Sequence, residues 1–186
     1  MAVKAVVAGV ALPVRKPSAI LILIRIKNFV GGTAMSCVLL PTNYHHYHAP
    51  VTGKIVEGME VPGIYNGIMD GEHWFNEGNI GESDTQFSIF EDFHRAYYIF
   101  ETRKYGYVAM IPVGLNTISS IHPSVVGRRS SYVAPGGKPI AVQKGQELGY
   151  FAYGGSLNIL LFQPGVIDGI SVLQGQRIGQ LGAVSG

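Results

Sequence analysis

The chain has 186 residues, enough for one domain with a buried core. Hydrophobic residues make up 47% and charged residues 14%, which excludes a disordered protein and a highly charged surface binder. The net charge of +2 points to no particular partner, and the single cysteine, Cys37, excludes an internal disulfide and a cysteine-based zinc site.

The first part of the chain is basic. Residues 1–44 contain no Asp or Glu, but they contain Lys4, Arg15, Lys16, Arg25 and Lys27. The apolar runs at 5–12 and 19–24 are shorter than the ~20 residues of a membrane-spanning helix, and 19–26 predicts one buried strand. We expect residues 1–37 to form a basic, divergent N-terminal segment. A secretory signal, a surface-seeking segment and an organelle-targeting segment all fit its composition.

From residue 38 onward the pattern is typical of β-structure. Short apolar or aromatic runs alternate with Gly and Pro, the pattern of a sandwich or barrel. The runs lie at 38–40, 53–56, 96–100, 107–113, 148–153 and 157–162, with a further strand or its approach at 84–92. Only 70–76 and 165–173 have a weakly helical pattern. The sequence therefore predicts a mainly β (α+β) single domain, a β-sandwich or barrel with few short helices.

Two stretches carry chemistry. Ser156 follows Gly154 and Gly155 between two runs that predict buried strands, so the serine is expected in a rigid corner and the preceding carbonyl is open to attack. Residues 43–48 (NYHHYH) place three imidazoles within four positions. A hydroxyl that acts as a nucleophile needs a base within hydrogen-bond reach, and histidine is the usual base near neutral pH.

These stretches resemble the phosphatidylserine decarboxylase family. Residues 43–53 (NYHHYHAPVTG) are similar to its histidine motif, Asp-Tyr-His-x-x-His-x-Pro-x-x-Gly, and 113–121 (VGLNTISSI) to its Val-Gly-Ala-x-x-Val-Gly-Ser-Ile stretch. Residues 144–151, the Gly155-Ser156 junction and 178–180 also match, in the family's order. The resemblance covers about 38–186, which we take as the decarboxylase-like domain, and the Gly-Gly-Ser form resembles the fungal and secondary-metabolism branch.

The resemblance implies a carboxy-lyase that processes itself. The family's proenzyme cuts itself before the motif serine, here between Gly155 and Ser156, and that serine becomes a covalent pyruvoyl cofactor. A Schiff base with the substrate amine then allows carbon dioxide to leave, forming phosphatidylethanolamine. By the same resemblance His48 is the base on Ser156 and later an acid, His45 orients it or the substrate carboxylate, and no metal is needed.

The sequence departs from the family pattern where an acid is expected. No acidic residue precedes Glu57, and Asn43 stands at the motif aspartate that would help to orient a histidine. We therefore expect slow self-cleavage and a mostly uncut purified chain, unless another carboxylate (Asp70, Glu72 or Asp84) takes that role. An N-terminus that begins downstream of the family's Asp-Gly motif would account for the missing aspartate and for the basic segment.

Other classes of protein stay open. A metallohydrolase would use His46 and His48, which share a face if they lie on a strand, but His73, His94 and His122 are isolated in the sequence. A lipoyl- or biotinyl-type carrier would share the pattern at 49–55 and 144–146 but lacks the Met-Lys-Met hairpin. A non-catalytic homologue that never forms pyruvoyl is the main rival.

The substrate follows only from the resemblance, which favours phosphatidylserine. The alternative is a free aromatic amino acid such as tryptophan, against which Tyr44 and Tyr47 could stack as substrate-binding residues. We expect an amino-acid-type or phospholipid substrate and no nucleic-acid partner. Peripheral membrane contact and a homodimer are compatible with the sequence, as are cytoplasmic, membrane-associated and mitochondrial locations.

Overall fold

The computed structural model describes residues 5–9, 27–39, 44–63, 93–114, 121–123, 137–152 and 156–167. These parts of the chain contain ten β-strands and one helical element, the 3-10 helix η2 (Lys27–Phe29). The strands are β1 (Ala5–Gly9), β2 (Thr33–Leu39), β3 (His46–His48), β4 (Gly53–Val61), β5 (Arg95–Glu101), β6 (Tyr107–Gly114), β7 (Ile121–Pro123), β8 (Ile140–Val142), β9 (Glu147–Phe151) and β10 (Ser156–Phe162).

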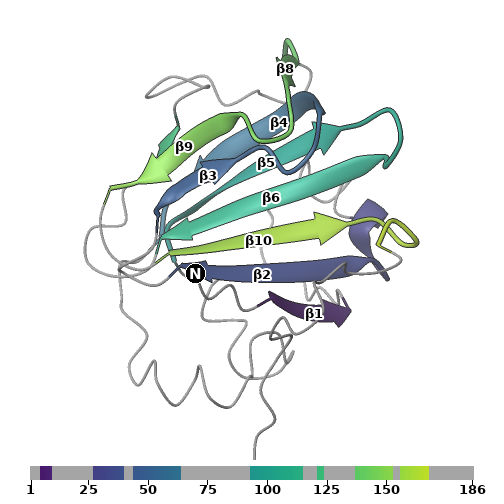
Figure 1. The fold of residues 1–186 in the computed structure, drawn as a ribbon, viewed down its shortest axis with the longest axis horizontal. Helices are drawn as coiled ribbons and strands as arrows, with labels where there is room; N and C mark the ends of the chain where they lie inside the picture. Colours follow the sequence, from purple (N-terminus) through teal and green to yellow (C-terminus); the bar gives the residue numbers. More distant parts are fainter. Residues whose placement is uncertain are drawn as a thin grey trace, which may run out of the picture.

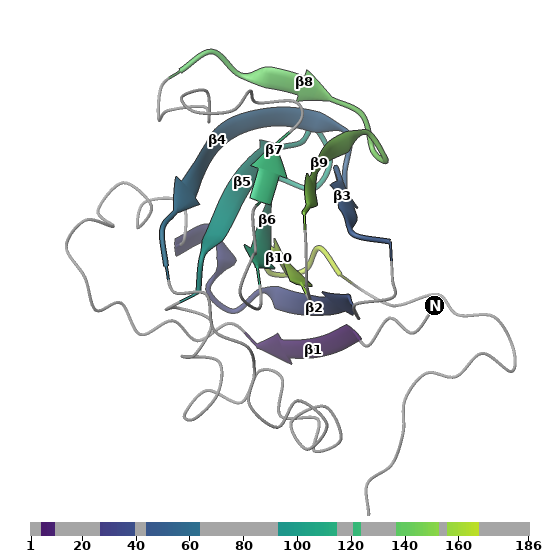
Figure 2. The same ribbon diagram turned by 90° about the vertical axis from the view of Figure 1, so that its left-hand side faces the viewer.

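The strands form two antiparallel sheets (Figure 1). The large sheet has the order β1-β2-β10-β6-β5-β4-β8, and the small sheet has the order β3-β9-β7. The large sheet is curved, and the small sheet lies on its concave side (Figure 2). This arrangement confirms the predicted mainly β, sandwich-like architecture.

Side-chain alternation gives the large sheet two buried faces. On β5, Tyr98 and Phe100 point into the core between the two sheets, whereas Ile99 points to the opposite face and packs with Phe29 of η2. From the small sheet, the core receives Tyr47, Leu148 and Phe151. Burying each large apolar side chain contributes about 1.5–3 kcal/mol, so this inter-sheet core is the main source of the fold's stability.

Each of the six apolar runs predicted from residue 38 onward contributes to a strand. The run at 38–40 is the end of β2, which begins at Thr33, and the run at 53–56 continues in β4 to Val61. The strands predicted at 19–26 and 84–92 and the weak helix at 70–76 lie outside the described residues. Of the weak helix at 165–173, residues 165–167 are not helical and the remainder is not described.

No helix in the described ranges is long and apolar enough to span a membrane.

Candidate active site at one end of the sandwich

Ser156 is the first residue of β10, a central strand of the large sheet. It lies opposite Leu39 of β2 and Gly114 of β6. Its side chain points between the sheets, because Leu160 and Phe162, at the same alternation along β10, pack with the inter-sheet core. Ser156 is 0% exposed, and its Oγ has no hydrogen-bond partner among the described residues. Buried polar atoms are nearly always paired, so this hydroxyl is a candidate for chemistry.

Gly114, on the neighbouring strand β6, lies directly opposite Ser156. The Gly114 N–H donates to the His94 carbonyl at 3.0 Å, so the main-chain groups of Gly114 point toward β5. Ser156 and Gly114 are therefore a non-hydrogen-bonded pair, in which Cα atoms approach to about 4.5 Å. Because Gly114 has no side chain, nothing projects beside the Ser156 hydroxyl in that direction.

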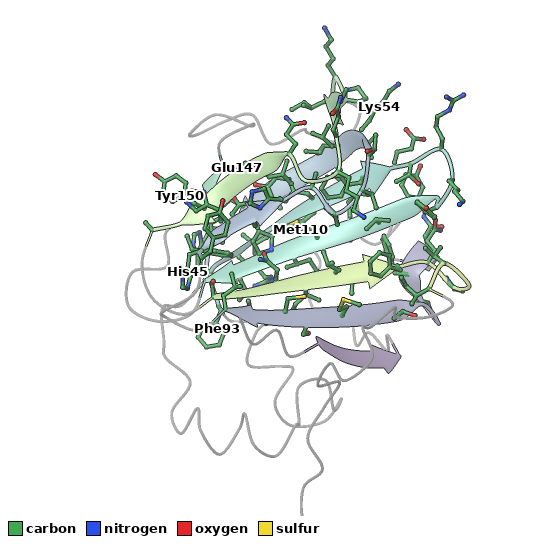
Figure 3. All side chains as sticks on the ribbon, in the orientation of Figure 1. His45, Lys54, Phe93, Met110, Glu147 and Tyr150 are labelled. Carbon is green, nitrogen blue, oxygen red and sulfur yellow. The ribbon has the colours of Figure 1, made fainter. Side chains whose placement is uncertain are left out.

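His45 lies at the same end of the sandwich. Its carbonyl accepts a hydrogen bond from the Phe151 N–H at 2.8 Å, which extends the pairing of β3 with β9 by one residue. In this register His45 and Tyr47 share the face that points into the inter-sheet core. Figure 3 shows His45 at the end of the large sheet where β10 begins. Only four residues, 152–155, separate Phe151 from Ser156 in the sequence, and 153–155, including Gly155, are outside the described residues.

Tyr47, predicted to bind substrate, is a core residue in the structure. It is 1% exposed, and its hydroxyl lies 3.3 Å from the Tyr98 hydroxyl. The ring packs against Phe151 at a centroid distance of 5.3 Å.

The other predicted site residues gather on the outer face of β3. His46 and His48 share one face, as expected for alternate residues of a strand, and the exposed Tyr44 ring stacks on both at centroid distances of 4.7 and 5.8 Å. The Tyr44 hydroxyl is 3.5 Å from His48 Nε2, and His46 Nδ1 is 3.2 Å from Glu147 Oε1. The structure thus brings Tyr44 and His48 together and places His45 on the side of Ser156. It forms no hydrogen bond between Ser156 Oγ and His48.

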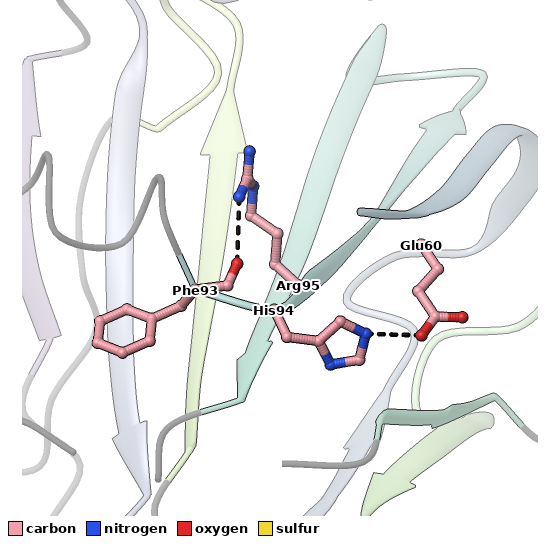
Figure 4. Close-up of polar contacts among 4 residues, drawn as sticks. All are labelled: Glu60, Phe93, His94 and Arg95. Carbon is pink, nitrogen blue, oxygen red and sulfur yellow. Dashed lines mark hydrogen bonds and ion pairs between the residues drawn. The ribbon is translucent and has the colours of Figure 1, made fainter. Parts of the chain in front are cut away.

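A buried histidine pairs with a half-exposed carboxylate beside this end of the sheet. His94 Nε2 is 2.6 Å from Glu60 Oε1 (Figure 4); the His94 side chain is 5% exposed and that of Glu60 46%. The next residue, Arg95, donates to the Phe93 carbonyl at 3.1 Å. His94 is isolated in the sequence, and only the pairing of β4 with β5 reveals its partner. No local sequence signal could have found this pair.

A second carboxylate faces the other side of the large sheet. Glu57 is 2% exposed and accepts a hydrogen bond from the Tyr97 hydroxyl at 3.0 Å. Burial, together with the negative charge and hydrogen bond of Glu57, raises the pKa of Tyr97. Burial likewise raises the pKa of the Cys37 thiol. Both groups are held in their neutral, protonated form, so neither is suited to act as a nucleophile.

The described residues contain no group of three or more His, Cys, Asp or Glu that could hold a metal ion. What they do contain is an inward-facing serine without a hydrogen-bond partner and several imidazoles around one end of a β-sandwich. This arrangement defines a β protein with a candidate serine-based site at the end of its sheets.

The chain belongs to the phosphatidylserine decarboxylase family, whose model matches residues 11–181. The phosphatidylserine decarboxylase proenzyme of Fusobacterium nucleatum is 31% identical over 137 residues, which are 74% of this chain and 39% of that protein. The phosphatidylserine decarboxylase proenzyme 2 of Oryza sativa is 28% identical over 138 residues, which are 74% of this chain and 19% of that protein. The phosphatidylserine decarboxylase proenzyme of Chlamydia trachomatis serovar L2 is 31% identical over 136 residues, which are 73% of this chain and 38% of that protein.

The chain thus spans about two fifths or less of the length of these curated relatives. No solved structure gives a significant match.

Proposed function

We propose that this chain carries the catalytic core of a self-processing phosphatidylserine decarboxylase, with Ser156 as the residue that is converted to pyruvoyl. The observation that carries the proposal is the Ser156 hydroxyl, which is fully buried at the start of β10 and has no hydrogen-bond partner among the described residues. The relatives, whose names describe them as proenzymes of this decarboxylase, support the same assignment.

In the proposed self-cleavage, His48 takes the proton of Ser156 and the oxygen attacks the Gly155 carbonyl carbon. The peptide bond between Gly155 and Ser156 breaks, the nitrogen leaves with a proton, and an ester joins the two segments. A base then takes the Ser156 Cα proton, the Cβ–O bond breaks, and the Gly155 carboxylate leaves behind a dehydroalanine. This enamine takes a proton at Cβ and becomes an imine. Water replaces the imine nitrogen, which leaves as ammonia, and a pyruvoyl group remains at residue 156.

In the structure His48 lies on the outer face of β3, away from Ser156, so the end of this strand has to rearrange before His48 can reach the hydroxyl. The His48 Nε2 lies 3.5 Å from the Tyr44 hydroxyl, the long limit for a hydrogen bond, so little is lost when that contact opens. His45 already shares the inner face with Tyr47. We therefore assign His45 to the substrate carboxylate or to orienting His48.

The site fits a pyruvoyl group, because the Ser156 hydroxyl makes no hydrogen bond to the described residues that the fold would lose on conversion. When present, the group supplies an electrophilic carbonyl that accepts electrons as carbon dioxide leaves, the role that pyridoxal phosphate has in other enzymes. The buried position of residue 156 shields the reacting centre from bulk water, apart from the one water molecule that self-cleavage consumes. His48, protonated after cleavage, is the proposed proton donor to the product carbon, which yields phosphatidylethanolamine.

The test uses the full chain after incubation for several days, because the missing motif aspartate predicts slow self-cleavage. Intact mass should show a cut between 155 and 156 and a downstream segment that begins with a carbonyl group, detected by its mass shift with a hydrazine. Carboxyl-labelled phosphatidylserine in detergent micelles should then release labelled carbon dioxide. Ser156→Ala should abolish both signals, while Ser36→Ala, a buried serine on β2, should retain both. A protein that stays uncut and releases no carbon dioxide would contradict the proposal and favour a non-catalytic homologue.

A further inference from the structure

Asn158 lies two residues after Ser156 on β10. Alternation along the strand places both side chains on the face that packs against the small sheet. The Asn158 Oδ1 is buried and, like Ser156 Oγ, has no hydrogen-bond partner among the described residues. Two neighbouring side chains thus present unpaired polar atoms on the same face.

The strands beside Asn158 do not explain an amide at this position. Its opposite residues are Cys37 on β2 and Pro112 on β6. Neither neighbour offers a strong side-chain partner, because a thiol is a weak hydrogen-bonding group and a proline ring has none. The following residues on this face, Leu160 and Phe162, are apolar. A buried polar atom without a partner is uncommon and calls for an explanation.

The spacing of the two residues suggests a common ligand. Alternate residues of a strand are about 6.5–7 Å apart. A substrate whose amine reaches position 156 and whose remainder follows β10 would bring its next polar group to Asn158. The side-chain amide of Asn158 has both a hydrogen-bond donor, the NH2 group, and an acceptor, the carbonyl oxygen. A half-turn of the amide group exchanges the positions of these two groups.

We propose that Asn158 is a substrate-contacting residue whose side-chain amide hydrogen-bonds the polar head group beyond the reacting amine. This inference rests on the proposed decarboxylase function. For a phosphoserine head group, the amide N–H donates to a phosphate oxygen. The contact acts in substrate binding and has no part in self-cleavage, which requires only the serine, its base and the preceding carbonyl.

The test compares Asn158→Leu and Asn158→Asp in the full-length enzyme. Asn158→Leu keeps a similar volume without the hydrogen bond, and Asn158→Asp keeps the shape but repels an anionic head group. Both variants should be cut at the wild-type rate. The KM for phosphatidylserine should rise about tenfold in Asn158→Leu, the value of one hydrogen bond, and further in Asn158→Asp, with kcat little changed.

Cys37→Ala is the matched control, because it alters packing opposite Asn158 on the same face and removes no partner of the substrate. It should leave KM and cleavage unchanged. If Asn158→Leu fails to fold, Asn158→Asp and Asn158→Ser supply the same comparison.

Three outcomes are distinguishable. An unchanged KM in folded, cleaved variants overturns the assignment. Loss of cleavage in these variants overturns it as well, because Asn158 would then act on Ser156. A wild-type enzyme that neither cuts itself nor releases carbon dioxide removes the proposed function, and this inference with it.

Discussion

Ser156→Ala should abolish self-cleavage and decarboxylation without weakening the fold. The Ser156 hydroxyl is fully buried and has no hydrogen-bond partner among the described residues. A buried, unpaired polar group costs roughly 1–3 kcal/mol relative to its hydrated state. Alanine removes that group and leaves the strand geometry unchanged. We therefore expect the free energy of unfolding to stay the same or to rise by up to about 3 kcal/mol.

The assay is urea unfolding followed by circular dichroism, with intact mass to confirm that each sample is uncut. The reference is the uncut wild-type protein, because a nick in the chain would itself change the transition. Each kcal/mol of added stability should raise Tm by about 2–4 °C for a domain of this size.

Ser36→Ala controls for the general effect of replacing a buried serine. Ser36 is 3% exposed on β2 and faces the opposite side of the large sheet from Leu39. Two results would refute the reasoning: a Ser156→Ala protein that loses more than about 1 kcal/mol of stability, the value of a typical hydrogen bond, or one that still splits.

Three further predictions concern other residues. His48→Ala should block the cut seen by mass spectrometry, because it removes the base, whereas His45→Ala should still be cut and mainly slow carbon dioxide release; equal, mild effects would indicate a generic polar loop. Burial raises the pKa of Cys37 above its ordinary value of 9.0, so the folded state keeps a proton that the unfolded state loses, and stability should fall as pH rises above about 9. In Cys37→Ala, the free energy of unfolding measured by urea titration should fall less steeply with rising pH than in the wild type. A pH profile identical to that of the wild type would contradict this role of Cys37. His94→Ala should lower the free energy of unfolding by about 1–3 kcal/mol, since it removes a buried partner of Glu60; Glu60→Gln should lower it less, and the reverse order would mean that the pair is not the source.

The fold class could be predicted because its signal is local. The apolar or aromatic runs of β5, β6 and β10 last five to seven residues, and those of β6 and β10 end within two residues of Gly114 and Pro164. Their length and punctuation indicate strands whatever the partners. The early start of β2 was missed because Thr33–Cys37 is a mixed sequence with no strong alternation. Its strand state depends on pairing with β1 and β10.

The face on which a side chain lies could not be predicted. Tyr44 and Tyr47 are both tyrosines of the histidine motif, yet one stacks on histidines at the surface and the other is buried against Tyr98. Strand alternation predicts that neighbouring side chains lie on opposite faces of the sheet. Which of the two faces is buried depends on where the second sheet packs. The pairing of His94 with Glu60 joins residues 34 positions apart and likewise depends on strand register.

The environment of the Asn158 side chain could not be predicted from the sequence either. In the sequence it is one polar residue within an apolar run, typical of a strand that meets solvent. Because β10 is paired on both sides and its inner face contributes to the inter-sheet core, the Oδ1 atom of the amide is buried instead.

The position of β10 has a consequence for the proposed self-cleavage. A cut before Ser156 would sever the chain at the first residue of a strand that is paired along its whole length with β2 on one side and β6 on the other. Removing the downstream fragment would leave two unpaired sheet edges and open the core, so the fragment should stay bound. A protein cut at this point should therefore run as two bands on a denaturing gel but sediment as one particle of unchanged size. The new terminus would be held at the reacting centre by the two neighbouring strands, as firmly as the intact chain held the serine.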